Sequence, residues 1–372
     1  MVRVRVRGRR AGRSSGPGID GPGRRVAGVG AAALAALAAL TVGARPAAAD
    51  PPGPTDYRST ISEVVPEVDG IDVRIVGGDA FLEIEVAAGH EVEVEGYGGE
   101  PYLRVLADGR VERNRRSEAT YLNEDREGAV AVPAEADNDA DPDWEVVADG
   151  GTYAWHDHRI HWMGGTAPPG VGPGDLVQDW TVALTVDGTP TAVRGELVMA
   201  EEVSPLTWAA LALVAAALVV VVGRRRTAAV AAAAVTAAAL AALVVGWGEY
   251  AAAPAGSGAN PLLVGVPLAG LVAAVAGLAR RGRTVGPTLT LAAAAAVIGW
   301  ALLRLEVLWT PVLPTDLPDA LDRAGTALAL GLSVAGAGLV VWSGGLAIGR
   351  PTADATAATD DPDPGADTAA TA

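Results

Sequence analysis

Apolar residues follow two different patterns in this chain, and the change from one to the other divides it. In the first pattern they alternate with acidic residues, as in Leu82–Val86 and Glu91–Glu95. Alternation with a period of two is typical of β-strands that bury one face. From residue 206 onwards, long apolar runs replace the alternation. The pattern therefore predicts a β domain over residues 63–203, followed by a helical membrane domain.

Turn signals separate the alternating segments. The four residues Ala87–His90 suit a hairpin loop between the two segments just described. Asp187-Gly188 is a tight-turn dipeptide between the alternating segments Trp180–Val186 and Thr191–Met199. Short strands bounded by such turns predict an all-β domain, and we expect an Ig-like antiparallel sandwich.

The apolar runs have the length of membrane spans. A spanning helix needs about 20 predominantly apolar residues, because lipid offers the backbone no other hydrogen-bond partners. Five runs reach or approach that length, and they predict five transmembrane helices at 206–222, 227–247, 261–279, 287–309 and 325–348.

Arginine clusters predict how these helices are oriented. Arg224-Arg225-Arg226 follows the first run, and Arg280-Arg281-Gly282-Arg283 follows the third. Such clusters remain in the cytoplasm. The loops 248–260 and 310–322 contain no arginine. We therefore expect a multi-pass protein of the cell membrane, in contact with the lipid bilayer, whose β domain lies outside and whose carboxy-terminal tail lies in the cytoplasm.

The two ends of the chain have compositions of their own. Residues 1–25 contain eight arginines and one acid, and an apolar stretch and an Ala-x-Ala site follow. This order predicts a signal peptide over residues 1–49. The apolar stretch of 17 residues also approaches the length of a span, so an uncleaved anchor is the alternative. Residues 50–62 are rich in Pro, Ser and Thr and predict a linker, whereas residues 349–372 predict a disordered tail.

Few ionisable residues interrupt the apolar runs. Glu249, Arg304 and Glu306 lie near run ends, and none lies near the middle of a run. Ion pumps usually need charged groups inside the membrane, so the pattern disfavours a transporter. We expect Arg304 and Glu306 to extend towards the membrane surface.

The charge of the β domain excludes nucleic acid as a partner. From residue 50 to residue 204 the chain has 33 acids and 10 arginines, a field that repels nucleic acid and attracts cations. The chain has no cysteine, so it has neither disulfides nor thiolate metal ligands. It also lacks the Gly-x-Ser-x-Gly, His-Glu-x-x-His and phosphate-loop motifs. We therefore expect no enzymatic activity.

Three of the four histidines lie together at positions 156, 158 and 161. Imidazole is the commonest metal ligand, which makes His156, His158 and His161 candidate ligands for copper or zinc. Met163 adds a soft thioether that suits copper, and His90 is a further candidate. A straight strand would point His161 away from the other two, so a shared site requires a bend in the chain.

The same run can also be interpreted without a metal ion. Asp157 could accept hydrogen bonds from Arg159 or from a histidine and so hold an irregular loop. The run could also form a surface that responds to pH or binds a partner. The sequence therefore predicts an extracytoplasmic binding or accessory domain, with metal binding as one function and a structural or envelope-protein interaction module as the alternative.

Several segments of the β domain resemble a group of uncharacterised actinobacterial membrane proteins with an exported β domain. The segments are Gly96–Val105, Asp108-Gly109, Asn114, Ser117–Asn123 and the run Trp155–Met163, which reads WHDHRxHWM with Ile160 as x. The resemblance implies the same order of signal, β domain and carboxy-terminal helices. It implies no activity.

Overall fold

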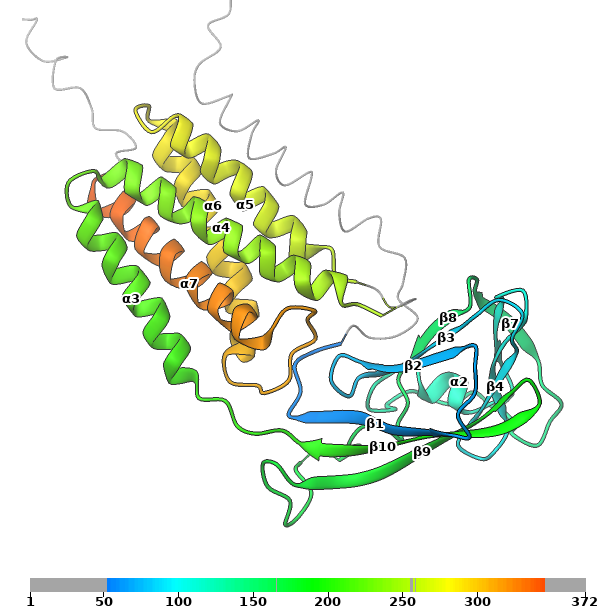
Figure 1. Cartoon of the computed structure of the whole chain (residues 1–372). Helices are drawn as coiled ribbons and strands as arrows, with labels where there is room; N and C mark the ends of the chain where they lie inside the picture. The colour runs from blue at the N-terminus through cyan, green and yellow to red at the C-terminus, as the bar shows by residue number, and fades with distance from the viewer. Residues whose placement is uncertain (1–51, 165, 255–256, 258, 345–372) are drawn as a thin grey trace, which may run out of the picture.

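The computed structural model describes residues 52–164, 166–254, 257 and 259–344. An antiparallel β region comes first along the chain, and five long apolar helices follow it (Figure 1). The predicted signal peptide 1–49 and the predicted tail 349–372 lie outside the described residues.

Two separate antiparallel sheets form the β region. The larger sheet has seven strands in the order β1 (Tyr57–Val65), β10 (Thr189–Met199), β9 (Leu176–Val186), β4 (Val92–Glu95), β5 (Pro101–Val105), β6 (Val111–Asn114) and β7 (Trp144–Ala148). The smaller sheet has the order β2 (Ile71–Val76), β3 (Phe81–Val86) and β8 (Thr152–Trp155). A short helix, α2 (Ala119–Leu122), follows β6.

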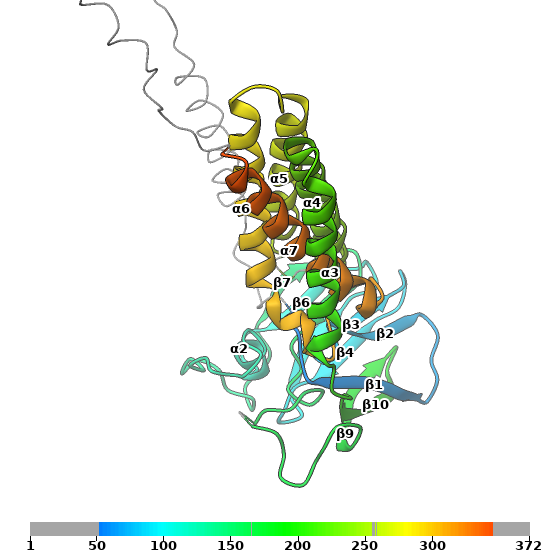
Figure 2. The ribbon, with the colours of Figure 1, turned by 90° about the vertical axis from the view of Figure 1, so that its left-hand side faces the viewer.

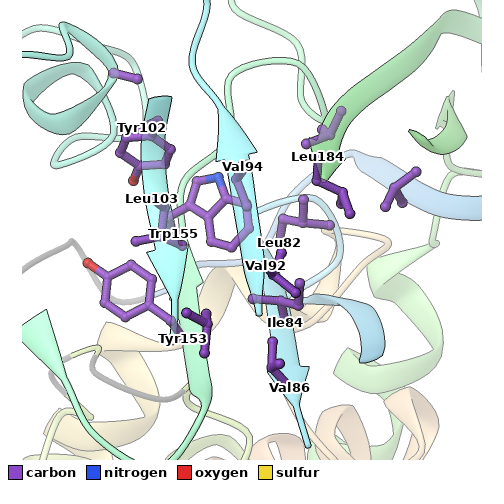
Figure 3. Close-up of a cluster of buried hydrophobic side chains, with 14 of the residues drawn as sticks. Leu82, Ile84, Val86, Val92, Val94, Tyr102, Leu103, Tyr153, Trp155 and Leu184 are labelled. Atoms are coloured by element: carbon purple, nitrogen blue, oxygen red, sulfur yellow. The ribbon is translucent and has the colours of Figure 1, made fainter. Parts of the chain in front are cut away.

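One hydrophobic core is shared by the two sheets. The smaller sheet contributes Ile84 and Trp155, and the larger sheet contributes Val94, Leu103 and Leu184 (Figure 3). Along β4 buried and exposed residues alternate strictly, with the valines inside and the glutamates outside. The alternation in the sequence therefore identified correctly which face of this strand is buried.

The predicted hairpin around Ala87–His90 is wrong. β3 pairs with β2 and β8, whereas β4 pairs with β5 and β9, so the two strands belong to different sheets. Glu83 consequently does not face the glutamates of β4. It is buried and accepts a hydrogen bond from Arg74 on β2 at 2.7 Å. Alternation predicted the buried face of β4, but in β3 it failed at Glu83, which is buried as well, and it leaves the pairing partner open.

The first strand begins inside the stretch that we expected to be a linker. Tyr57 starts β1, which pairs along its length with β10. Just before it, Thr55 is already hydrogen bonded to the helical region. Residues 55–62 therefore belong to the folded β region.

Among the residues that the structure describes, five helices are long and apolar enough to cross a membrane, as predicted. They are α3 (Pro205–Gly223), α4 (Thr227–Ala251), α5 (Leu262–Ala279), α6 (Val285–Leu303) and α7 (Asp319–Trp342) (Figure 2). α6 ends before the predicted boundary, and the 3-10 helix η1 (Leu305–Leu308) follows it. α7 begins earlier than predicted, and Asp319 and Asp322 in its first turn suit the positive end of the helix dipole.

A main-chain contact joins the β region to the helices. Thr55 and Val312 exchange two hydrogen bonds, from the Thr55 N–H to the Val312 carbonyl at 3.0 Å and back at 3.1 Å. The buried side chain of Val312 also packs close to Gly78. The loop between η1 and α7 therefore lies at the same end of the helical region as the β region (Figure 1).

A buried ionic cluster lies close to this loop. Arg304 is only 7% exposed, pairs with Glu249 of α4 and donates to Asp322 of α7 at 3.0 Å. The expectation that Arg304 reaches the membrane surface is therefore wrong, because two carboxylates from other helices retain it inside. Glu306 is exposed.

A substitution at Gly195 tests how closely β10 packs against its neighbours. A Cβ at this position would overlap the ring of Trp180 and the carbonyl oxygen of Thr60. We expect Gly195→Ala to lower the free energy of unfolding by about 1–3 kcal/mol, the usual cost of overpacking. Thermal unfolding of the full chain in detergent measures this loss. Gly53→Ala is the control, because a Cβ there meets nothing within 4 Å. Equal melting temperatures for both variants would contradict the prediction.

Candidate functional site

The histidine run is a loop that follows β8. The strand ends at Trp155, and the Ile160 N–H donates to the Asp157 carbonyl at 3.0 Å, which closes a turn. Trp155 and Ile160 are both buried in the shared core and so fix the two ends of this turn. The chain therefore bends within the run, as a shared histidine site requires.

A buried carboxylate organises the turn. Asp157 is 0% exposed and accepts from the Arg159 guanidinium twice at 2.7 Å, from the Arg159 main-chain N–H at 3.0 Å and from Trp155 Nε1 at 2.9 Å. Burial raises the pKa of Asp157, but the charge and hydrogen bonds of Arg159 outweigh burial and hold that pKa below its usual value. The expected network between Asp157 and Arg159 is confirmed.

All three histidines of the run face main-chain carbonyl groups. His156 Nδ1 lies 2.7 Å from the Ala80 oxygen, His158 Nε2 lies 3.1 Å from the Asp125 oxygen and His161 Nε2 lies 2.6 Å from the Arg126 oxygen. A carbonyl oxygen only accepts, so each of these nitrogens carries the proton. In the neutral rings of His158 and His161, the unprotonated nitrogen is therefore Nδ1.

The structure brings His158 and His161 together. Their ring centroids lie 5.3 Å apart at an interplanar angle of 75°, and Tyr97 stacks on His158 with a centroid separation of 5.6 Å. His156 instead packs against Phe81 with a centroid separation of 4.0 Å. The run thus divides into a pair of adjacent imidazoles and a third imidazole held against β3.

His161 is neutral and has an unused nitrogen. Its side chain is only 2% exposed, and its Nδ1 has no hydrogen-bond partner among the described residues. Burial, together with the nearby charge of Arg126, lowers the pKa of His161 to about 4. At neutral pH this ring therefore presents a buried lone pair.

The remaining candidates occupy different positions. Met163 is 46% exposed, and its methyl group and His158 Nδ1 lie 3.6 and 3.4 Å from the point that a Cβ on Gly128 would occupy. His90 binds Asp187 at the β9–β10 turn at 2.7 Å. Among the described residues, no three His, Cys, Asp or Glu side chains converge in a way that could hold a metal ion.

The carbonyl groups that face His158 and His161 belong to Asp125 and Arg126. This segment connects the histidine run to the helical region. Arg126 donates to the buried Asp79 at 2.6 Å and to Thr55 Oγ1 at 3.3 Å. Burial raises the pKa of Asp79 even though Arg126 lies beside it. Thr55 in turn pairs with Val312. Contacts therefore run without a break from His161 to the loop before α7.

Sequence reasoning missed the residues that surround the run. Asp79, Arg126 and Tyr97 lie far from it along the chain. Tyr97 falls within the segment Gly96–Val105 named above, but neither Asp79 nor Arg126 belongs to a motif. Gln178 of β9 also donates to the carbonyl groups of Arg159 at 2.9 Å and His161 at 3.4 Å. No signal in a single sequence identifies such partners, because they depend on how the two sheets face each other.

Asp157 tests whether the turn depends on its ion pair. We expect Asp157→Asn to lower the free energy of unfolding by about 3 kcal/mol, since removing one member of a buried pair leaves the other without compensation. Thermal unfolding of the full chain provides the measurement. The control is Glu63→Gln, which breaks the exposed pair with Arg194 at 2.8 Å and should cost under about 0.5 kcal/mol. A loss as small as that of the control would show that the pair does not support the turn.

His161 gives the protein a pH dependence with a definite sign. Its folded pKa of about 4 lies below the ordinary value of 6.5, so the unfolded chain binds a proton first as the pH falls. We expect full stability above about pH 6.5 and a loss of up to about 3 kcal/mol as the pH falls to 4. Unfolding of chelator-treated protein at several pH values measures it. In His161→Gln, which can still donate to Arg126, the loss over this range should be smaller, and an unchanged pH profile would contradict the assignment.

No protein-family model, curated protein or solved structure matches this chain. Its function must therefore be inferred from the geometry of the described residues. Two features of that geometry bear on function: the contacts from the histidine run to the helical region, and the paired imidazoles of His158 and His161.

Proposed function

We propose that the protein is a multi-pass cell-membrane protein whose β domain lies outside the cell and serves as a docked, non-catalytic binding or accessory module. The observation that carries this proposal is the series of contacts from His161 through Arg126 and Thr55 to Val312. A domain on a free tether would need no such contacts. A domain held in one orientation presents the same surface to an envelope partner at all times.

The helical region supports docking by fixing the loop that the β domain contacts. Arg323 donates to the carbonyl groups of Val307 at 3.0 Å, Thr310 at 2.8 Å and Pro311 at 2.8 Å. Thr310 and Pro311 directly precede Val312. The docking point is therefore anchored to α7 by a buried guanidinium group, and it does not move as a free loop.

The orientation rests on the arginine clusters. Both clusters, Arg224–Arg226 and Arg280–Arg283, follow helices at the end remote from the β domain. We also assign the β domain to the Ig-like class, because two antiparallel sheets enclose one core.

Extracytoplasmic metal handling is a second candidate function. The observation in its favour is the buried, unpartnered Nδ1 of His161 beside the ring of His158. His156 lies apart from this pair, because its ring packs against Phe81 with a centroid separation of 4.0 Å. His90 is engaged by Asp187.

Docking can be tested with introduced cysteines, because the chain has none of its own. Residues that exchange two antiparallel hydrogen bonds have Cα atoms about 5.5 Å apart, within the range of a disulfide. We expect Thr55→Cys/Val312→Cys to form a disulfide under mild oxidation, detected by mass spectrometry of the joined peptides. The matched control is Thr55→Cys/Leu313→Cys, in which the second cysteine follows the paired position. Equal yields in both pairs, or none in the first, would refute docking.

Orientation can be tested in the same cysteine-free background. We expect Ala129→Cys in the β domain to react with a membrane-impermeant maleimide in intact cells. Gly282→Cys, in the loop after α5, should react only after the membrane is opened. Both positions are exposed, and a Cβ at Gly282 meets nothing within 4 Å. The reverse labelling pattern would place the β domain in the cytoplasm.

A further inference from the structure

We propose that His158 Nδ1, His161 Nδ1 and Met163 Sδ form a three-coordinate site for a single Cu(I) ion. The site rests on the metal-handling candidate and is independent of how the β domain docks. It names two nitrogen atoms and one sulfur atom as ligands, and it leaves out His156 and His90.

Hydrogen bonds to the main chain determine which nitrogen atom of each imidazole can bind a metal. Because the Asp125 and Arg126 carbonyls accept from the two Nε2–H groups, both Nδ1 atoms carry lone pairs. Metal-bound imidazoles usually donate their other N–H to a carbonyl or carboxylate group, which fixes the ring and raises its basicity. The two adjacent carbonyl groups occupy that role here before any metal is bound.

The separation of the rings suits a shared ion. A metal about 2.0 Å from a ring nitrogen lies about 3 Å from the centroid of that ring. Two imidazoles bound to one ion therefore have centroids up to about 6 Å apart when the three centres are in line. The observed 5.3 Å between the His158 and His161 centroids lies within this limit.

Met163 is placed to supply that third ligand. Its methyl group and His158 Nδ1 lie around the same point, the one that a Cβ on Gly128 would occupy. Such a Cβ would lie 2.7 Å from His158 Cε1, so only glycine leaves this space open. Met163 is 46% exposed, whereas His161 is 2% exposed, so the thioether is the ligand of this set that lies nearest to solvent.

The chemistry of this set favours Cu(I) over Zn(II). Thioether sulfur is a soft ligand that selects Cu(I), and imidazole also suits copper. Structural zinc takes four ligands from Cys, His, Asp and Glu. No group of three such residues that could hold a metal converges among the described residues. The excess of acids over arginines in the β domain favours the approach of cations.

Competition for Cu(I) tests the site in the full chain. The purified protein in detergent is titrated under anaerobic, reducing conditions against a chromophoric Cu(I) chelator. We expect one Cu(I) per chain for the wild type, with at least a tenfold weaker affinity for Met163→Leu and for His158→Gln. Met199→Leu and His90→Gln are the matched controls and should bind as the wild type does. X-ray absorption should show one sulfur ligand in the wild type and none in Met163→Leu.

Each alternative result has a distinct meaning. Absence of Cu(I) binding by the wild type, or wild-type affinity in Met163→Leu, overturns the site. Zn(II) bound more tightly than Cu(I) also overturns it but preserves metal handling. Melting temperatures of the variants separate loss of a ligand from loss of the fold, and Met163→Leu should melt as the wild type does because Met163 is half exposed. The Thr55–Val312 disulfide, measured in the same background, reports docking separately.

Discussion

The ion pair between Asp157 and Arg159 is the interaction on which the arrangement of the β domain depends. A carboxylate that is excluded from water must be paired and hydrogen bonded. Arg159 can satisfy Asp157 only if the chain folds back directly after β8. That turn carries His158 and His161 to the segment that contains Arg126. The burial of the Asp157 carboxylate thereby fixes the position of the segment around Arg126, which is distant in sequence.

The same requirement recurs in the helical region. Arg304 is enclosed by Glu249 and Asp322, which come from two different helices, and it therefore ties α4, α6 and α7 together at one end. Arg323, one residue after Asp322, binds the loop that meets Thr55. Arginine side chains thus stabilise both partners of the contact between the two regions: the half-buried Arg126 acts through Asp79, and the buried Arg323 belongs to α7.

The sequence was sufficient where a local pattern has a single physical meaning. Apolar runs of about 20 residues predicted five helices, and the alternation at Val92–Glu95 predicted the buried face of β4. The sequence was insufficient where the position of a residue depends on partners that are distant in the chain. The sheet to which β3 belongs, the burial of Arg304 and the carbonyl groups that fix the histidine tautomers all depend on residues far away in the chain. From the sequence we could state only that a shared histidine site requires a bend within the run. Whether the chain bends there depends on the burial of Asp157, which no local pattern indicates.

The bridge between Thr55 and Val312 imposes an order on biosynthesis. Thr55 precedes the first strand, whereas Val312 lies between the last two helices. The two sheets contain all their own strands, so they can fold as soon as the chain emerges. The bridge can form only after the chain has been made as far as the loop that follows η1. A chain that ended before that loop would leave the main chain of Thr55 without the two hydrogen bonds that it exchanges with Val312.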